Sequence, residues 1–150
     1  MTTTPKPTHW LFRIGDGKHF DSSSKYKIWG INSKNTCCKN FMKKVKEGDI
    51  LWFIKSGSRG LIYSVAKFVS YNERIIGPLI TISKTNEELG WTNFEGFWDI
   101  EIHYKDVLFL SKVNLLTCIK GPCTIRVYNE KCKIDLEQEY INIYKYSQIQ

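Results

Sequence analysis

The clearest periodic pattern in the chain is helical and runs from Thr36 to Lys46. Its apolar residues recur at positions i, i+3, i+4 and i+7, which places them on one face of a helix. They are Cys38, Phe41, Met42 and Val45. We expect this face to pack on a core. Asn35 or Thr36 can cap the start of the helix, and Gly48 can end it.

Short β-like runs bounded by Gly, Asn, Asp and Ser contain most of the other apolar residues. The predicted strands are His9 to Ile14, Tyr26 to Ile31, Ile50 to Ile54, Leu61 to Ser70, Ile75 to Ile82, Phe97 to Val107, Leu115 to Ile119 and Thr124 to Tyr128. Gly15 to Ser24 is rich in Gly, Asp and Ser, which predicts a loop. Leu136, Tyr140 and Ile143 are spaced for a modest helix near the C-terminus. The pattern is that of an α+β domain.

The run from Phe97 to Val107 alternates between apolar and polar side chains, as in a strand packed on one side only. Its apolar residues are Trp98, Ile100, Ile102 and Tyr104. Its polar residues are Asp99, Glu101, His103 and Lys105. We expect Trp98 in the core and the polar residues in water. Asp99 and Glu101 are therefore interpreted as solubility residues and not as an acid/base pair.

The predicted strands that end at Ile54 and begin at Leu61 are joined by Lys55 to Gly60, which predicts a hairpin with a flexible basic loop. The loop lacks the GKS/T ending of a P-loop and opens no helix. Lys55 and Arg59 could contact a nucleic-acid backbone. An ordinary mobile turn is the alternative.

Composition fits one basic domain. The chain has 150 residues, enough for a single core, and carries a net charge of +7, which favours anionic partners. Aromatic residues make up 14%, which suits a β-rich protein and supplies surfaces for base stacking. We expect a disordered lead-in at residues 1–8 and one domain at 9–150. The helix lysines are most simply a solvated face, with phosphate contacts as the alternative.

The apolar runs are too short to cross a bilayer, and the first residues lack a signal-peptide core, so we expect a cytoplasmic protein without a membrane partner. The five cysteines include no CxxC pair and are interpreted as reduced thiols. We expect neither a metal nor another cofactor. No histidine lies in a HExxH or similar motif, and His19 beside Asp21 is the only setting that resembles an active site.

Several segments in one order carry a family resemblance. Ser24 to Ile31 (SKYKIWGI), preceded by His9 to Arg13 (HWLFR), resembles the opening of EVE domains in the PUA-like superfamily, which are similar to YTH domains. Val45 to Phe53 (VKEGDILWF) and Gly60 to Ala66 (GLIYSVA) resemble the family's "VKxGDxLxFY" and "GIxxVA" signatures. Gly90 to Ile100 resembles the aromatic segment before the next barrel strand.

This resemblance implies a partly closed β-barrel flanked by helices that holds a modified or flipped-out base and catalyses no reaction. It places Trp29 at the first aromatic of the base-binding pocket, with Gly30 beside it in the pocket, and Trp91 or Phe94 at a second. Gly30 and Ile31 stand where YTH proteins have small polar residues, so the resemblance does not identify the base.

Polar groups near the expected pocket could read the edge of a base through paired donors and acceptors. They are Asn32, Ser33 and the segment from Arg13 to Asp16. The predicted function is therefore a non-catalytic reader of a base in RNA or DNA. An enzyme that uses His19 and Asp21 in the same pocket, and a protein-interaction module, remain as alternatives.

Overall fold

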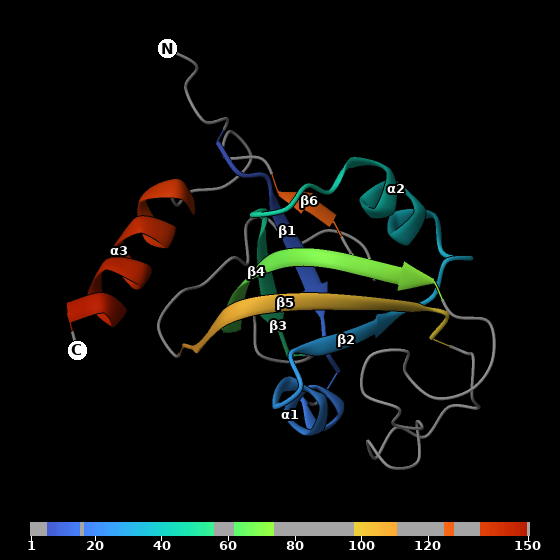
Figure 1. Cartoon of the computed structure of the whole chain (residues 1–150), viewed down its shortest axis with the longest axis horizontal. Coiled ribbons are helices and arrows are strands. Elements are labelled where there is room, and N and C mark those ends of the chain that lie inside the picture. The colour runs from blue at the N-terminus through green and yellow to red at the C-terminus, as the bar shows by residue number, and fades with distance from the viewer. Residues whose placement is uncertain are drawn as a thin grey trace.

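The computed structural model describes residues 6–15, 17–55, 62–73, 98–110, 125–127 and 136–149. The helices are α1 (Lys18–Ser24), α2 (Thr36–Lys44) and α3 (Leu136–Ile149). The strands are β1 (His9–Arg13), β2 (Ile28–Ile31), β3 (Ile50–Ile54), β4 (Ile62–Glu73), β5 (Ile100–Phe109) and β6 (Ile125–Val127). The strands form one six-stranded sheet in the order β2-β5-β4-β3-β1-β6 (Figure 1).

The sheet is mixed and strongly curved. β1 runs parallel to β3, while the other neighbouring strands are antiparallel, including the predicted β3–β4 hairpin pair. In Figure 1, β5 and the end of β4 run across the direction of β1 and β3, so the sheet forms a partly closed barrel. This α+β architecture is the predicted one.

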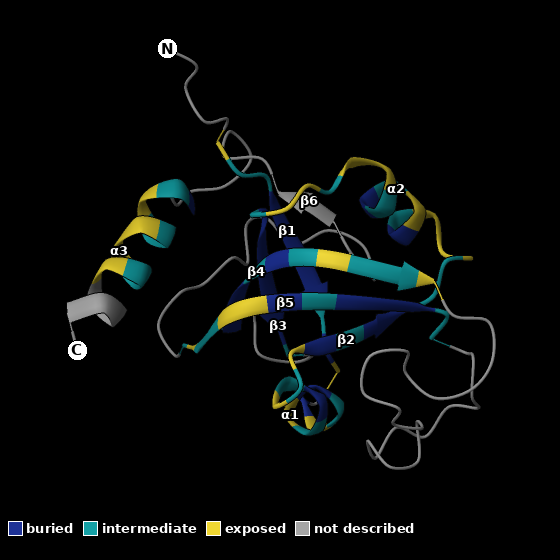
Figure 2. Ribbon diagram, in the orientation of Figure 1, coloured by how far each residue is buried: buried dark blue, intermediate teal, exposed yellow. Residues whose placement is uncertain are grey.

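Two apolar clusters lie on opposite faces of the sheet, and we call them the inner and the outer cluster. The inner cluster includes Phe12, Phe53 and Ile102 and is covered by Phe20 of α1 and Phe41 of α2. The outer cluster joins residues of β1, β3 and β4 to α3. Its members are Leu11, Ile50, Trp52, Ile54, Ile62, Val65 and Leu136. Figure 2 shows the buried residues of the strands, which contribute to both clusters, in dark blue.

The predicted amphipathic helix is confirmed as α2. Asn35 is its N-cap, and its side-chain oxygen accepts the Cys37 backbone N–H at 2.9 Å. Cys38 and Phe41 are buried, and Met42 packs against the inner cluster. The helix ends at Lys44, two residues earlier than predicted, because the backbone at the next residue is already extended.

The segment from Gly15 to Ser24 was predicted as a loop, and this prediction is wrong. It contains α1, which buries Phe20 and Ser23 against the sheet. Three serine hydroxyls hydrogen-bond to the carbonyl three residues earlier, so these side chains bond within the helix. Gly17 starts the helix with φ +90°, and a Cβ there would lie 2.5 Å from Cε of Lys55.

The polar face of β5 was predicted to lie in water, and this prediction is wrong for Glu101. Its carboxylate is fully buried, with Oε1 2.9 Å from Nε2 of His103. The same His103 nitrogen lies 3.1 Å from the amide nitrogen of Asn72 on β4. Alternation identifies residues that share a face, but a polar pair can be buried when its members bond to each other.

Asp99 and Trp98 also depart from the expectation. Asp99 is half-buried and hydrogen-bonded to Ser33. Trp98 is half-buried and precedes the strand, so it is not a core residue.

Several predicted elements lie outside the described residues: Ile75 to Ile82, Leu115 to Ile119, most of the Lys55 to Gly60 loop, and residues 1–5 of the lead-in. Within the lead-in, the Thr8 backbone N–H donates to Oδ1 of Asp49 at 3.0 Å. Among the described helices, none is long and apolar enough to span a membrane.

Candidate nucleic-acid interface

Trp29 lies on the edge strand β2 and faces the inner cluster. It is half-buried, and its backbone pairs with Ile102 of β5. The Phe20 ring of α1 packs edge-on against its indole, with centroids 5.9 Å apart and planes at 64°. The α1 helix directly precedes β2 in the chain and was predicted as a loop. Its Phe20 ring therefore helps to position Trp29, the predicted base-binding residue.

A cluster of rings continues from Phe20 along the same face. The Phe20 ring stacks on Tyr104, with ring centroids 6.1 Å apart, and its centroid lies 4.5 Å from that of Phe53. Tyr104 follows Ile102 by two residues, so it is a diagonal neighbour of Trp29 on the inner face. Its buried hydroxyl has no hydrogen-bond partner among the described residues, and burial raises its pKa. The environment beside Trp29 on this face is therefore aromatic and largely apolar.

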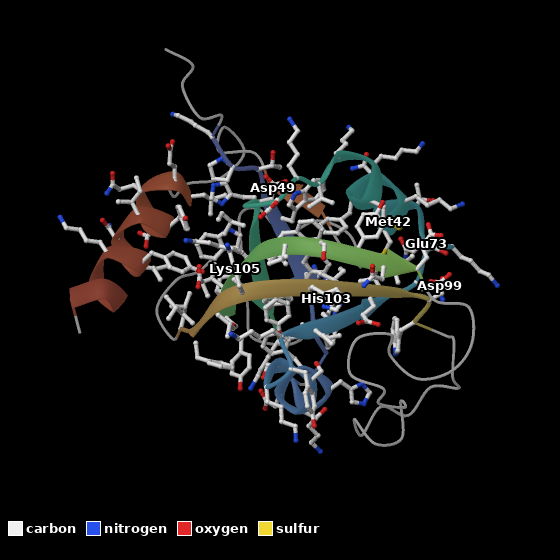
Figure 3. All side chains as sticks on the ribbon, in the orientation of Figure 1. Met42, Asp49, Glu73, Asp99, His103 and Lys105 are labelled. Carbon is white, nitrogen blue, oxygen red and sulfur yellow. The ribbon has the colours of Figure 1, made fainter. Side chains whose placement is uncertain are left out.

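The corner between β2 and α2 is held by hydrogen bonds from the predicted edge-reading residues. The Ser33 backbone N–H donates to Oδ1 of Asp99 at 2.8 Å, and the Ser33 hydroxyl donates to the other carboxylate oxygen. Oδ1 of Asn32 accepts the Lys34 backbone N–H at 2.9 Å. Figure 3 shows Asp99 at the end of the sheet where this corner lies. These contacts hold the corner in one conformation.

The other predicted pocket residues are placed differently. Gly30 is buried and pairs with Glu101. As the next residue of β2, it faces the opposite side of the sheet from Trp29. Arg13 follows Leu11 by two residues, and Leu11 belongs to the outer cluster. The structure therefore does not bring Arg13 to the face that carries Trp29.

Lys55 is the predicted backbone contact that the structure describes. Its Nζ lies 3.8 Å from the centroid of the Tyr63 ring, a cation–π contact at the start of β4. Trp91, Phe94 and Arg59 lie outside the described residues.

Two aromatic residues at this end of the barrel were not predicted as site residues. The rings of Tyr63 and Phe109 contact each other, with centroids 5.3 Å apart, and both rings contact Phe20. Tyr63 lies in the predicted strand from Leu61 to Ser70, whereas Phe109 lies beyond the predicted strand that ended at Val107. No local pattern indicated that the two strand ends meet.

The setting of His19 and Asp21 offers little for catalysis. They lie two residues apart on α1, a spacing at which helical side chains do not face each other. Oδ1 of Asp21 accepts the Tyr63 hydroxyl at 2.7 Å. Among the described residues, no group of His, Cys, Asp and Glu could hold a metal ion. Cys37 and Cys38 form no disulfide with any described residue, while the other three cysteines lie outside the described part.

No family model and no curated protein matches the sequence. Solved structures do match the fold. The YTH domain of the Zygosaccharomyces rouxii MRB1 protein, solved with N6-methyladenosine RNA, has a TM-score of 0.58 and 13% identity, over 97% of this chain and 89% of that chain. The YTH domain-containing protein mmi1, solved with RNA, has a TM-score of 0.58 and 9% identity, over 96% of this chain and 87% of that chain.

The Pho92 YTH domain, solved in complex with m6A, has a TM-score of 0.56 and 16% identity, over 97% of this chain and 88% of that chain. The likeness thus spans nearly the whole of each chain. At these low identities it concerns the fold, and the chain has the YTH-like architecture of a partly closed barrel with flanking helices.

Proposed function

We propose that this chain is a non-catalytic RNA-binding module that holds one modified nucleobase against Trp29. The observation that carries the proposal is the half-buried indole on β2, fixed beside Phe20, in a fold shared with YTH domains solved with RNA. Two of those domains were solved with N6-methyladenosine. We further propose that the chain is an EVE domain of the PUA-like superfamily, on the resemblance of its sequence motifs.

The chemistry of a base suits this position. A base has apolar faces and polar edges, so an aromatic wall can bind the face while neighbouring polar groups read the edge. Trp29 is held by β2 pairing on one side and by Phe20 on another. A ring that is already ordered loses little further entropy when a base stacks on it, which favours binding. By the resemblance, Trp91 or Phe94 would close the site from the other side.

Charge supports an RNA partner. The net charge of +7 attracts a phosphodiester chain without selecting a sequence. Exposed lysines lie on both elements that flank β2, with Lys18 on α1 and Lys39 and Lys43 on α2. Phosphates can therefore be contacted while the base is held at Trp29.

Binding has more support than catalysis. The proposed enzyme pair, His19 and Asp21, does not converge on α1, and Asp21 is engaged by the Tyr63 hydroxyl. We therefore assign recognition and not turnover to the face that carries Trp29.

A binding screen tests the proposal. The purified protein is titrated by fluorescence anisotropy with RNA octamers that carry a central N6-methyladenosine, 5-methylcytidine or pseudouridine, beside unmodified octamers of the same sequence. At least one modified octamer should bind more tightly than its unmodified counterpart. Equal affinity for all octamers would contradict recognition of a modified base, and no binding would contradict the RNA-binding function.

Substitutions then assign the site. Trp29→Ala should weaken the preferred octamer by about 1–3 kcal/mol, whereas Trp29→Phe keeps a stacking ring and should lose less. Tyr140→Ala is the matched control, because Tyr140 is a partly buried aromatic packed on the outer cluster. Thermal unfolding is measured for each variant. Normal binding by Trp29→Ala would refute the site, as would equal losses for the Phe and Ala variants with folding intact.

A further inference from the structure

We propose that Phe109 and Tyr63, with Lys55, form a second stacking site that binds a nucleobase flanking the one held at Trp29. This inference rests on the proposed RNA-binding function. Phe109 is 55% exposed, whereas most large apolar side chains in the described part are buried. It ends β5, where it points to the same side of the sheet as Val107, which packs on the inner cluster. An exposed ring at the rim of an aromatic cluster is available for stacking.

The backbone holds this platform in place. Phe109 is paired with Ser64 across the β4–β5 ladder, and the Leu110 N–H donates to the Tyr63 carbonyl at 2.9 Å. The Tyr63 and Phe109 rings meet at 5.3 Å with planes at 75°. The Tyr63 hydroxyl donates to Asp21 of α1 at 2.7 Å, which fixes that ring as well. The two rings are thus ordered before any ligand arrives.

Charge at the platform selects nucleic acid as the occupant. Nζ of Lys55 lies 3.8 Å from the centroid of the Tyr63 ring, so a cation lies on the ring that contacts Phe109. Asp21 is an acidic group that contacts this cluster within the described part of the chain, and it accepts a hydrogen bond from the Tyr63 hydroxyl. Lys18 is exposed on the first turn of α1, three residues before Asp21, and adds a second cation on that helix. Aromatic rings interleaved with cations are the arrangement that binds single strands, with bases on rings and phosphates near lysines.

Phe20 links the platform to the first site. Its ring contacts Trp29 at 5.9 Å, Tyr63 at 6.1 Å and Phe109 at 6.2 Å. Trp29 and Phe109 are therefore separated by one intervening ring on the same face. A short single strand can cover both positions, since single-strand binding sites take about 4–16 nucleotides. Stacking tolerates any base, so the second site should add affinity without adding sequence preference.

The test compares an adenosine RNA octamer with adenosine monophosphate. One monophosphate molecule can occupy only one of the two sites at a time, whereas a single octamer can span both. Phe109→Ala should weaken octamer binding by roughly 5- to 150-fold and leave monophosphate binding at Trp29 unchanged. Phe109→Trp should retain octamer affinity. Ile141→Ala is the matched control, because Ile141 is an exposed large apolar side chain on α3, 46% exposed.

The outcomes separate the two proposals. A wild-type protein that binds the octamer, with Phe109→Ala binding equally well, overturns the second site and leaves the function at Trp29 standing. A wild-type protein that binds neither of these ligands nor any octamer of the binding screen refutes the RNA-binding function and this site together. Sedimentation of Phe109→Ala gives the remaining outcome: a loss of self-association with unchanged octamer affinity would assign Phe109 to contact with a second copy and overturn the inference.

Discussion

The carboxylate of Asp49 accepts the indole N–H of Trp10 at 3.1 Å, joining two buried residues 39 positions apart. The same carboxylate accepts the backbone N–H groups of Thr8 and Lys46, each at 3.0 Å. It therefore ties the start of β1 to the connection between α2 and β3. Gly48, at φ +92°, makes the turn that brings Asp49 inward. This gives a physical role to the Gly-Asp pair in the motif from Val45 to Phe53.

Asp49→Ala should destabilise the fold. The substitution leaves the buried Trp10 N–H without its acceptor, which alone costs at least about 1–3 kcal/mol. A double-mutant cycle with Trp10→Phe in urea unfolding isolates the bond, because Phe removes the donor. The two substitutions should couple by about 0.5–3 kcal/mol. Additive effects would show that the Asp49–Trp10 bond contributes nothing to stability.

Phe41→Ala should also destabilise the fold, because it removes packing from the inner cluster. The ring is fully buried and packs edge-on against Trp10 at 5.0 Å and Phe12 at 5.1 Å. Its removal should lower the free energy of unfolding by about 3–5 kcal/mol. Met42→Ala, at a half-buried position of the same helix, should lose less. A loss under about 1 kcal/mol for Phe41→Ala would contradict its place in the core.

The α2 helix was predictable because its apolar spacing alone sets which face is buried. The α1 helix was not, because Gly, Ser and Asp favour loops locally and its cap makes no side-chain hydrogen bond. Tertiary packing of Phe20 overrides that local preference. Glu101 shows the same limit on a strand, since alternation placed it correctly opposite Ile102 but could not reveal that His103 would satisfy it in a buried position.

The site was predictable only in part. Resemblance identified Trp29, and the structure places it half-buried on the inner face. Tyr63 and Phe109 meet through a pairing of distant strands, and such contacts leave no local pattern in a single sequence. Ser33 was expected to read a base, whereas its hydroxyl and N–H donate to Asp99, because half-buried polar groups need a hydrogen-bond partner within the fold.

The ionisation of Tyr63 gives a pH-dependent prediction. Donation to Asp21 stabilises the neutral phenol, and together with burial and the nearby negative charge it raises the Tyr63 pKa above the usual 10. A pKa raised in the folded state adds stability below pH 10, and this stability is lost as pH rises through the folded value. Asp21→Ala should lower the Tyr63 pKa, as followed by NMR of labelled tyrosine.

Asp21→Asn serves as the control for that measurement, because it keeps an acceptor for the Tyr63 hydroxyl and removes only the charge. The Tyr63 pKa in Asp21→Asn should lie between the values in the wild type and in Asp21→Ala. A wild-type pKa at or below 10, or one that Asp21→Ala leaves in place, would mean that the 2.7 Å hydrogen bond does not persist in solution.

The sequence pattern of the α2 lysines allowed two interpretations, a solvated helix face or phosphate contacts, and substitutions distinguish them. Lys39 and Lys43 are exposed on the helix that follows the β2–α2 corner. If they bind phosphates, each Ala substitution should weaken modified and unmodified octamers alike, because phosphates carry no base identity. The slope of log affinity against log salt should flatten by about 0.7 for each lysine–phosphate pair that a substitution removes from a single strand.

Lys145→Ala, at an exposed lysine of α3, should leave affinity and slope unchanged. Unchanged slopes for Lys39→Ala and Lys43→Ala would identify the α2 lysines as a solvated helix face, and the phosphates would then have to bind beside α1.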